Sequence, residues 1–79
     1  MRFIKFIVCN VLPDRKYNPM HCEYINVKKI KSFFVGKDPD GKQGVQLNDG
    51  QDKCFRDYRY IPADKDQFKE AFGLDWDEL

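Results

Sequence analysis

The chain has 79 residues, of which 34% are charged and 42% are hydrophobic, and its net charge is +1. This length allows one domain around one core, and the composition is typical of a folded globule and not of a disordered chain. The longest apolar run, residues 6–9, is far shorter than the roughly 20 residues that span a bilayer, so we expect no membrane segment. The three cysteines form no CxxC pair and are odd in number, which favours a reducing cytoplasm.

Basic and acidic residues are unevenly distributed along the chain. Residues 1–37 hold eight Lys and Arg against two acids, a net charge of +6, and residues 38–79 hold six against eleven, a net charge of −5. In a compact sheet the two halves interleave, so this asymmetry predicts cross-strand charge pairs. The alternative interpretation is a basic face suited to an acidic partner.

The first segments predict a strand and a loop. Residues 2–11 carry apolar side chains on both alternating faces, as in a strand at the centre of a sheet or one covered by a helix on its second face. Residues 12–20 contain two prolines and three charges, which predicts a loop. Loops on a rigid scaffold often make specific contacts, so Tyr17 is a candidate binding residue.

Residues 21–61 read as β-rich runs separated by two strong turn signals. Asp38-Pro39-Asp40-Gly41 suits a type I turn closed by a bulge, and Asn48-Asp49-Gly50 suits a tight hairpin. Two hairpins in series predict an antiparallel meander, in which the last strand ends at Pro62.

A short helix is predicted over residues 64–72. Asp64 is a good N-cap, Gln67 completes a capping-box pattern, and Gly73 stands where a C-cap glycine belongs. The apolar residues at i, i+3 and i+4 share one face: Phe68, Ala71 and Phe72. A helix of this length is stable only when it docks, so we expect this face to lie on the sheet.

The tail, residues 73–79, alternates apolar and acidic side chains. Either the tail folds back onto the sheet, or it presents Trp76 as an aromatic anchor among acids to a basic partner. The whole chain thus predicts a single α+β domain, residues 1–79. Its main element is a twisted antiparallel meander of about five strands, which could curl into a small SH3-like barrel, with one C-terminal helix packed on it.

No pattern in the sequence indicates catalysis. His21 and Cys22 are adjacent, but no second ligand pair at zinc spacing accompanies them, so we expect no metal. Ser32 has no glycine elbow and there is no glycine-rich phosphate loop. We therefore predict a non-enzymatic chain without a cofactor.

The preferred interpretation is a small cytoplasmic protein-binding or regulatory accessory module. Its candidate protein-binding residues are Tyr17, Lys28, Lys29 and Trp76. The alternative is a nucleic-acid-binding β module that uses a basic and aromatic strand face. That face would comprise Lys28, Lys29, Lys31, Arg56, Tyr58, Arg59 and Tyr60. The pI of 7.7 argues against a dedicated nucleic-acid binder. A homodimer formed through edge strands is a third alternative.

One stretch resembles a known family. Residues 24–33, Tyr-Ile-Asn-Val-Lys-Lys-Ile-Lys-Ser-Phe, followed by Val45-Gln46-Leu47-Asn48-Asp49-Gly50, are similar to the strand, Asn turn, Ile, strand and Asn-Gly hairpin layout of the flagellar FlbD/SwrD type. The resemblance covers about a third of the chain and rests on turn chemistry. The sequence departs from that type in the prolines of residues 12–20, in Asp38-Pro39-Asp40-Gly41 and in the Trp-containing tail. The resemblance implies a non-enzymatic accessory protein of bacterial or phage origin and assigns no functional residues.

Overall fold

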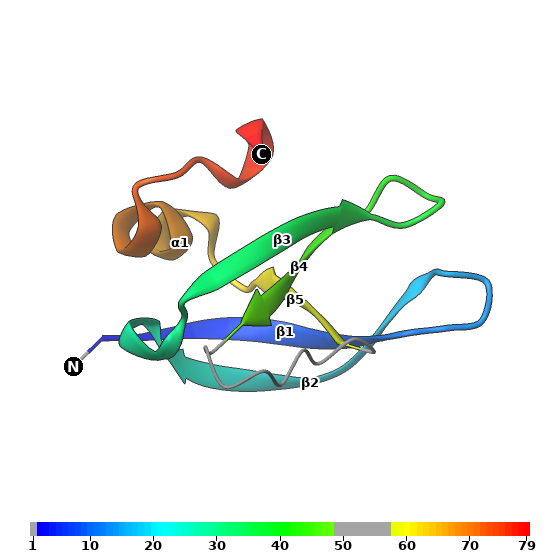
Figure 1. Ribbon diagram of the computed structural model, residues 1–79, viewed down its shortest axis with the longest axis horizontal. Helices are drawn as coiled ribbons and strands as arrows, with labels where there is room; N and C mark the ends of the chain where they lie inside the picture. Colours follow the sequence, from blue (N-terminus) through cyan, green and yellow to red (C-terminus); the bar gives the residue numbers. More distant parts are fainter. Residues whose placement is uncertain (1, 49–57) are drawn as a thin grey trace.

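The computed structural model describes residues 2–48 and 58–79. Within them lies a five-stranded antiparallel sheet with a helix near the C-terminus, so the predicted α+β class is confirmed (Figure 1). The elements in chain order are β1 (Phe3–Val11), β2 (Tyr17–Asn26), the 3-10 turn η1 (Val27–Lys29), β3 (Ser32–Lys37), β4 (Gln43–Asn48), β5 (Tyr58–Pro62), α1 (Lys65–Phe72) and the 3-10 turn η2 (Trp76–Glu78).

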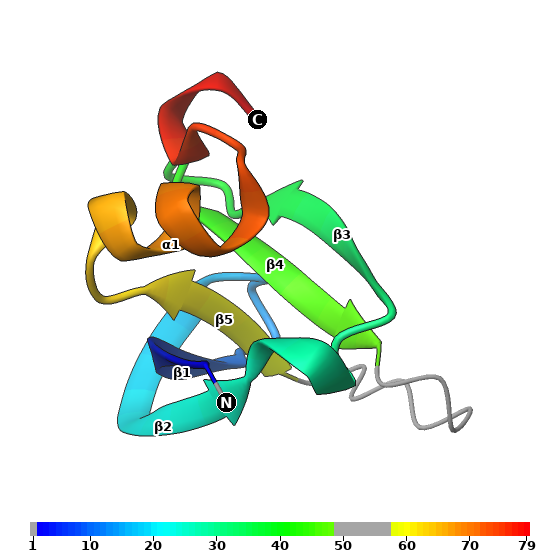
Figure 2. The same cartoon turned by 90° about the vertical axis from the view of Figure 1, so that its left-hand side faces the viewer.

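The order of strands in the sheet is β2-β1-β5-β4-β3. Three pairs join strands that follow one another in sequence: β1 with β2, β3 with β4, and β4 with β5. The fourth pair joins β1 with β5, and β2 and β3 do not pair but form the two edges of the sheet. The described sheet is therefore open, with β2 and β3 as its two edge strands. Figure 2 shows the curl of the sheet, with α1 and the C-terminal turn on one side of it. The first strand lies inside the sheet, between β2 and β5, which is the first of the two alternatives given for it.

The prediction of a loop over residues 12–20 is wrong for residues 17–20, which belong to β2. Only residues 12–16 connect the strands, and β2 already begins at Tyr17, which pairs with Val11. Pro19 is accommodated because β2 is an edge strand and because the β1–β2 register shifts between Val8 and Cys9. The prolines of this segment therefore mark a turn and a bulge and not one long loop.

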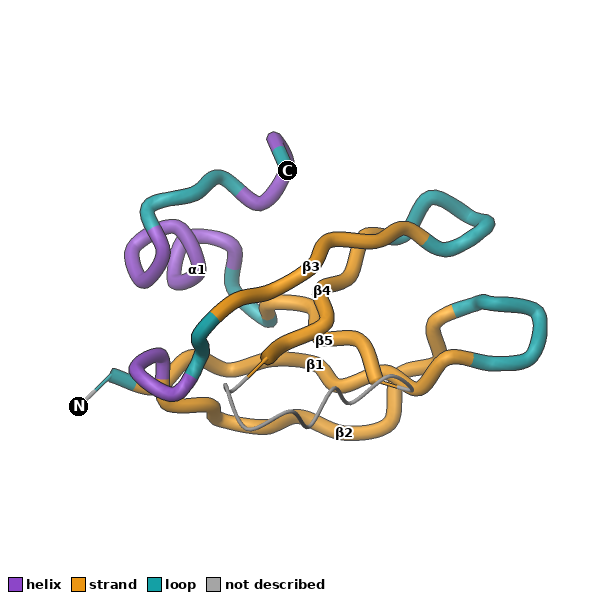
Figure 3. Tube along the Cα trace, viewed as in Figure 1, coloured by secondary structure: helices purple, strands orange, loops and turns teal. Residues whose placement is uncertain are grey.

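Two sequence predictions fall on residues 49–57, outside the described part of the chain. They are the Asn-Asp-Gly turn beyond Asn48 and the first half of the last strand, which includes Arg56. The described end of that strand, β5, stops at Pro62 as predicted. Figure 3 shows the strands and turns along the same trace.

The core lies between the concave face of the sheet and α1. The sheet contributes alternate residues of its central strands, and the C-terminal segment contributes two aromatic residues. The buried members are Ile4, Phe6, Val8, Val45, Leu47, Tyr60, Phe68 and Trp76. Phe68 is 1% exposed, and its ring centroid lies 5.2 Å from that of Trp76 and 6.2 Å from that of Phe33 on β3. The docking of the helix through its apolar face thus agrees with the sequence prediction.

Both predicted caps of α1 are present. The side chain of Asp64 accepts hydrogen bonds from the backbone N–H groups of Asp66 and Gln67, and Gly73 is left-handed with φ 69°. The capping-box role predicted for the Gln67 side chain is not what the structure shows. Its Oε1 instead accepts from the backbone N–H of Lys5 at 3.1 Å, which ties α1 to β1.

The tail folds back, which is the first of the two alternatives that its sequence left open. Trp76 is only 5% exposed and packs on Phe68, and its carbonyl oxygen accepts a hydrogen bond of 2.7 Å from Nε2 of Gln43. An ion pair of 2.8 Å between Lys65 and Asp77 closes the outside of this contact. Trp76 is therefore a core residue and not an exposed anchor.

The β3–β4 turn is organised by Asp38, which is 8% exposed. Its carboxylate accepts hydrogen bonds from the backbone N–H groups of Lys42 at 2.7 Å, Asp40 at 3.0 Å and Tyr17 at 3.4 Å. Burial opposes ionisation of this carboxyl, but the three N–H donors and the charge of Lys42 together outweigh burial and lower its pKa below the ordinary value. Asp38 thereby joins the β3–β4 turn to the start of β2.

Replacing Trp76 by alanine is expected to lower the free energy of unfolding by about 3–5 kcal/mol, the usual cost of removing a buried aromatic side chain. Urea unfolding followed by circular dichroism measures the effect, with Trp76→Phe as the control that retains an aromatic ring. An unchanged unfolding midpoint for Trp76→Ala would show that this side chain is not part of the core.

Asp38→Asn is expected to destabilise the fold at pH 7 and to have less effect at pH 3. The pKa of Asp38 is lowered on folding, so its charge contributes stability that is complete above the unfolded-state pKa of about 3.9 and is lost as pH falls through the lower folded value. Thermal unfolding of both proteins at the two pH values tests this, with exposed Asp40→Asn as the control. An equal difference between wild type and Asp38→Asn at both pH values contradicts it.

Candidate functional site

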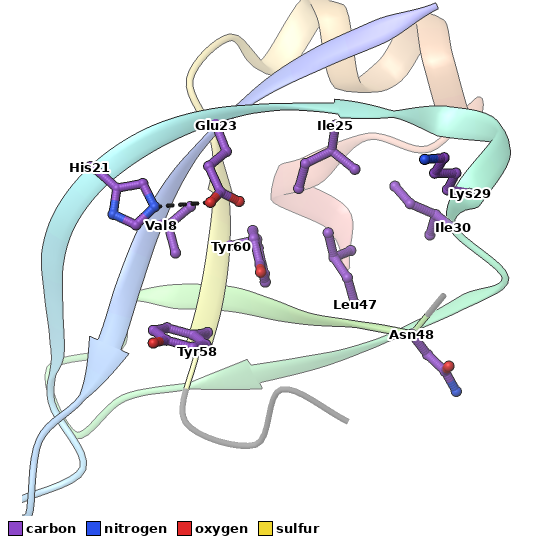
Figure 4. A pocket seen from close by; sticks show the side chains of 10 residues that line it. All are labelled: Val8, His21, Glu23, Ile25, Lys29, Ile30, Leu47, Asn48, Tyr58 and Tyr60. Carbon is purple, nitrogen blue, oxygen red and sulfur yellow. Dashed lines mark hydrogen bonds and ion pairs between the residues drawn. The ribbon is translucent and has the colours of Figure 1, made fainter. Parts of the chain in front are cut away.

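A pocket of about 350 Å³ opens on the concave side of the sheet, between the edge strand β2 and the β4–β5 pair (Figure 4). Five elements or their flanks supply its described lining. These residues are Val8, His21, Glu23, Ile25, Lys29, Ile30, Leu47, Asn48, Tyr58 and Tyr60. The pocket lies where the curled sheet is not closed.

The register of β2 on β1 explains why β2 lines this pocket. His21, Glu23 and Ile25 pair with Val8, Phe6 and Ile4, whose side chains face the core. Paired residues of neighbouring strands project to the same face of a sheet. Because β2 is an edge, the side chains of His21 and Glu23 remain about half exposed, at 49% and 47%.

The floor of the pocket is continuous with the core. Val8, Leu47 and Tyr60 belong both to the buried cluster and to the pocket lining. Half-buried Ile25 and Ile30 extend this apolar surface toward the opening. The pocket therefore offers an apolar surface to a binding partner, framed by polar side chains.

The polar side chains of the pocket differ in charge from one end to the other. His21 and Glu23 stand at one end, joined by a 3.1 Å contact between Nε2 and Oε1, whereas Lys29 stands at the other end (Figure 4). Burial and, after it, the Glu23 charge raise the pKa of Tyr60 above its ordinary value. This rise is consistent with a carboxylate close to the phenol. The pocket thus has an acidic end and a basic end.

The structure separates the residues predicted for nucleic-acid binding. Tyr58 and Tyr60 line the pocket, but Tyr60 is only 7% exposed, and Arg56 lies outside the described residues. The guanidinium of Arg59 lies 5.9 Å from the ring centroid of Tyr17, away from the pocket lining. Lys28 and Lys31 are exposed beside Lys29, which alone of these three lines the pocket. In the described part of this strand, Arg59 therefore lies on a different surface from Tyr58 and Tyr60.

The residues predicted for protein binding are also divided. Lys29 lines the pocket and Lys28 is its neighbour, but Trp76 is buried in the core. Tyr17 is half-buried at the start of β2, and its ring lies over Gly44 of β4, where an added Cβ would come within 3.0 Å of it. Tyr17 thus closes one end of the curled sheet and does not belong to the pocket.

Among the pocket residues that sequence reasoning missed, three lie on β2: His21, Glu23 and Ile25. Their i, i+2, i+4 spacing gave the signal that they share one face of a strand. Which face of β2 points inward depends on the pairing of His21 with Val8. The prediction of a loop over residues 12–20 gave no register for this pairing.

Across residues 2–48 and 58–79, no group of three or more His, Cys, Asp or Glu side chains is placed to hold a metal ion. Cys9 is fully buried, and burial raises the pKa of its thiol above the ordinary value, which keeps the thiol protonated and unreactive. Cys22 is exposed on β2. Among the described helices, none has the length and apolar character needed to cross a membrane.

A scan of the chain against protein families finds no match, and searches of curated proteins and of solved structures find no significant match either. The resemblance to the FlbD/SwrD type therefore stays a prediction.

Gly44→Ala is expected to destabilise the protein by about 1–3 kcal/mol, because the added methyl group would lie 3.0 Å from Cε2 of Tyr17 and 3.1 Å from Cβ of Arg59. The double variant with Tyr17→Ala should lose much of this penalty, since the ring is then gone. A double-mutant cycle in urea measures the coupling. Additive effects of the two changes would show that Tyr17 does not pack on Gly44.

Proposed function

We propose that this chain is a small non-enzymatic protein-binding module, an accessory or regulatory protein of the cytoplasm, and that the pocket beside β2 is its binding site. The observation that carries the proposal is an apolar pocket floor next to β2, which is an edge strand of the described sheet. An edge strand offers backbone hydrogen bonds, and a neighbouring pocket offers side-chain selectivity. The resemblance to the FlbD/SwrD type supports an accessory role in a bacterium or a phage.

The size and lining of the pocket support a protein partner. A volume of about 350 Å³ is at the low end for drug-sized ligands and accommodates one or two side chains of a partner. The apolar floor of Val8, Leu47 and Tyr60 suits an aliphatic or aromatic anchor. The charged ends at Glu23 and Lys29 would then select what flanks that anchor.

The nucleic-acid alternative has less support. Among the described lining residues, one base, Lys29, is offset by one acid, Glu23, and the ring of Tyr60 is largely buried. A single-strand binder needs a positive groove with exposed aromatic faces. Fluorescence polarisation with labelled single- and double-stranded DNA and RNA separates the two functions. Binding with a steep salt dependence would favour nucleic acid.

Random peptides displayed on phage, selected against the immobilised protein, provide the direct test. We expect the selected peptides to bind Ile25→Ala and Tyr58→Ala about five- to tenfold more weakly than wild type, since each change removes pocket surface. Phe34→Ala is the matched control, because Phe34 is 61% exposed on β3 and lies outside the described pocket lining.

Circular dichroism should show that all three variants are folded before affinities are compared. Equal weakening by the pocket changes and by Phe34→Ala, or no weakening by either pocket change, would overturn the assignment of the pocket as the binding site. Sedimentation at increasing concentration tests the third alternative, a homodimer. A dimer that Ile25→Ala dissociates would make a second copy the occupant.

A further inference from the structure

Within the described sheet, β2 pairs with β1 on one side and with no described strand on its other side. The N–H of Val27 donates to the carbonyl oxygen of Arg2 at 3.0 Å, in the same register that pairs Ile25 with Ile4 and Glu23 with Phe6. In an antiparallel pair, alternate residues direct their N–H and C=O groups toward the partner strand. The odd-numbered residues from His21 to Val27 therefore bond to β1, and the N–H groups of Cys22 and Tyr24 point away from it.

The same alternation links that other side of β2 to the pocket. A strand added to β2 would bond to Cys22 and Tyr24, and its residues opposite Glu23 and Ile25 would project to the concave face, where the pocket lies. The other sheet edge, β3, contributes none of the described lining residues. Of the two sheet edges, β2 is therefore the one at which an added strand would reach the pocket.

We propose that the partner protein supplies an extended segment that adds to β2 as a sixth, antiparallel strand. A cationic side chain of this segment lies opposite Glu23 and an apolar side chain lies opposite Ile25. This inference rests on the proposed function and specifies the chemistry of its partner. Every strand pair in the described sheet is antiparallel, so an antiparallel addition continues the existing geometry.

Charge fixes the register of the segment. Glu23 is the acid among the described lining residues, and Lys29 stands at the opposite end of the pocket (Figure 4). A cation is therefore attracted to the Glu23 end and repelled from the Lys29 end. The contact with His21 does not exhaust the carboxylate of Glu23, because two carboxylate oxygens offer about four acceptor positions.

The orientation predicts a sequence pattern in the partner. In an antiparallel strand, the residue opposite Ile25 comes two positions before the residue opposite Glu23. The segment should therefore read apolar, any residue, then Lys or Arg. The apolar side chain fills the pocket over Leu47 and Ile25, and the cation lies beside Glu23.

The first part of the test repeats the random peptide selection on wild type and on Glu23→Lys. Wild type should enrich Lys or Arg two positions after an apolar residue, and Glu23→Lys should enrich Asp or Glu there. For one peptide pair that differs only in this residue, we expect each protein to favour its own peptide about two- to fivefold. Glu70→Lys, an exposed change on α1 outside the described pocket lining, should leave the wild-type preference unchanged.

The second part measures amide hydrogen exchange by NMR with the tightest of the selected peptides. Slower exchange on binding is expected at Cys22 and Tyr24, and no such protection along β3. Equal enrichment of both charges, a cation placed before the apolar residue, or no protection at Cys22 and Tyr24 would overturn the strand addition.

The two proposals fail in different ways. Peptides that lose affinity in Ile25→Ala but give no protection at Cys22 and Tyr24 would leave the pocket as a protein-binding site and refute strand addition. Peptides that are insensitive to Ile25→Ala and to Tyr58→Ala would refute both.

Discussion

The packing of Phe68 against the sheet is the interaction on which the rest of this structure depends. An eight-residue helix is too short to be stable alone, so α1 exists because its apolar face is buried. Phe68 contacts Trp76, which brings the tail back, and Phe33, which attaches β3. The helix and tail thereby cover one part of the concave face. The remainder of that face, around Val8, Leu47 and Tyr60, is where the pocket lies.

The gap between the edge strands β2 and β3 is bounded by a contact at each of its two ends. At one end Tyr17 packs over Gly36 and Gly44, and its N–H bonds to Asp38, so the start of β2 is attached to the β3–β4 hairpin. At the other end η1, capped by the side chain of Asn26, joins β2 to β3 where a tight hairpin turn would otherwise pair them. Between these two attachments β2 and β3 are the edges of the described sheet, and an open pocket next to the core persists in a chain of only 79 residues.

Local chemistry made part of the fold predictable. Asp64 and Gly73 act through backbone groups within a few residues, so the ends of α1 followed from sequence alone. The loop over residues 12–20 was mispredicted because Pro19 breaks a strand unless that strand is an edge with a bulge, and edge position depends on distant residues. The site was less predictable still. Its residues come from several elements, and they converge only in the correct pairing register of the strands. Composition and turn signals do not determine that register.

The strand predicted to carry a basic and aromatic face shows what a two-residue periodicity can and cannot predict. Tyr58 and Tyr60 share a face, as a period of two requires, and the same period places Arg59 on the opposite face beside Tyr17. Grouping all three as one surface ignored that alternation. Applied to β2, the same rule places His21, Glu23 and Ile25 together on the inner face once their pairing with β1 is known.

Inward-facing polar residues on an edge strand have two physical interpretations. Such residues protect an exposed edge from pairing with other chains, and His21 and Glu23 suit that role. Protection alone, however, requires only charge on the edge, and it does not account for the half-buried Ile25 and Ile30 or for the opposite charges at the two ends of the pocket. An edge that selects its partner strand would account for the inward-facing polar residues, for the half-buried isoleucines and for the opposite charges at the two ends of the pocket. In the proposed strand addition, the edge admits a strand whose side chains match Glu23 and the apolar floor, and it excludes an unmatched strand by leaving its charges unpaired.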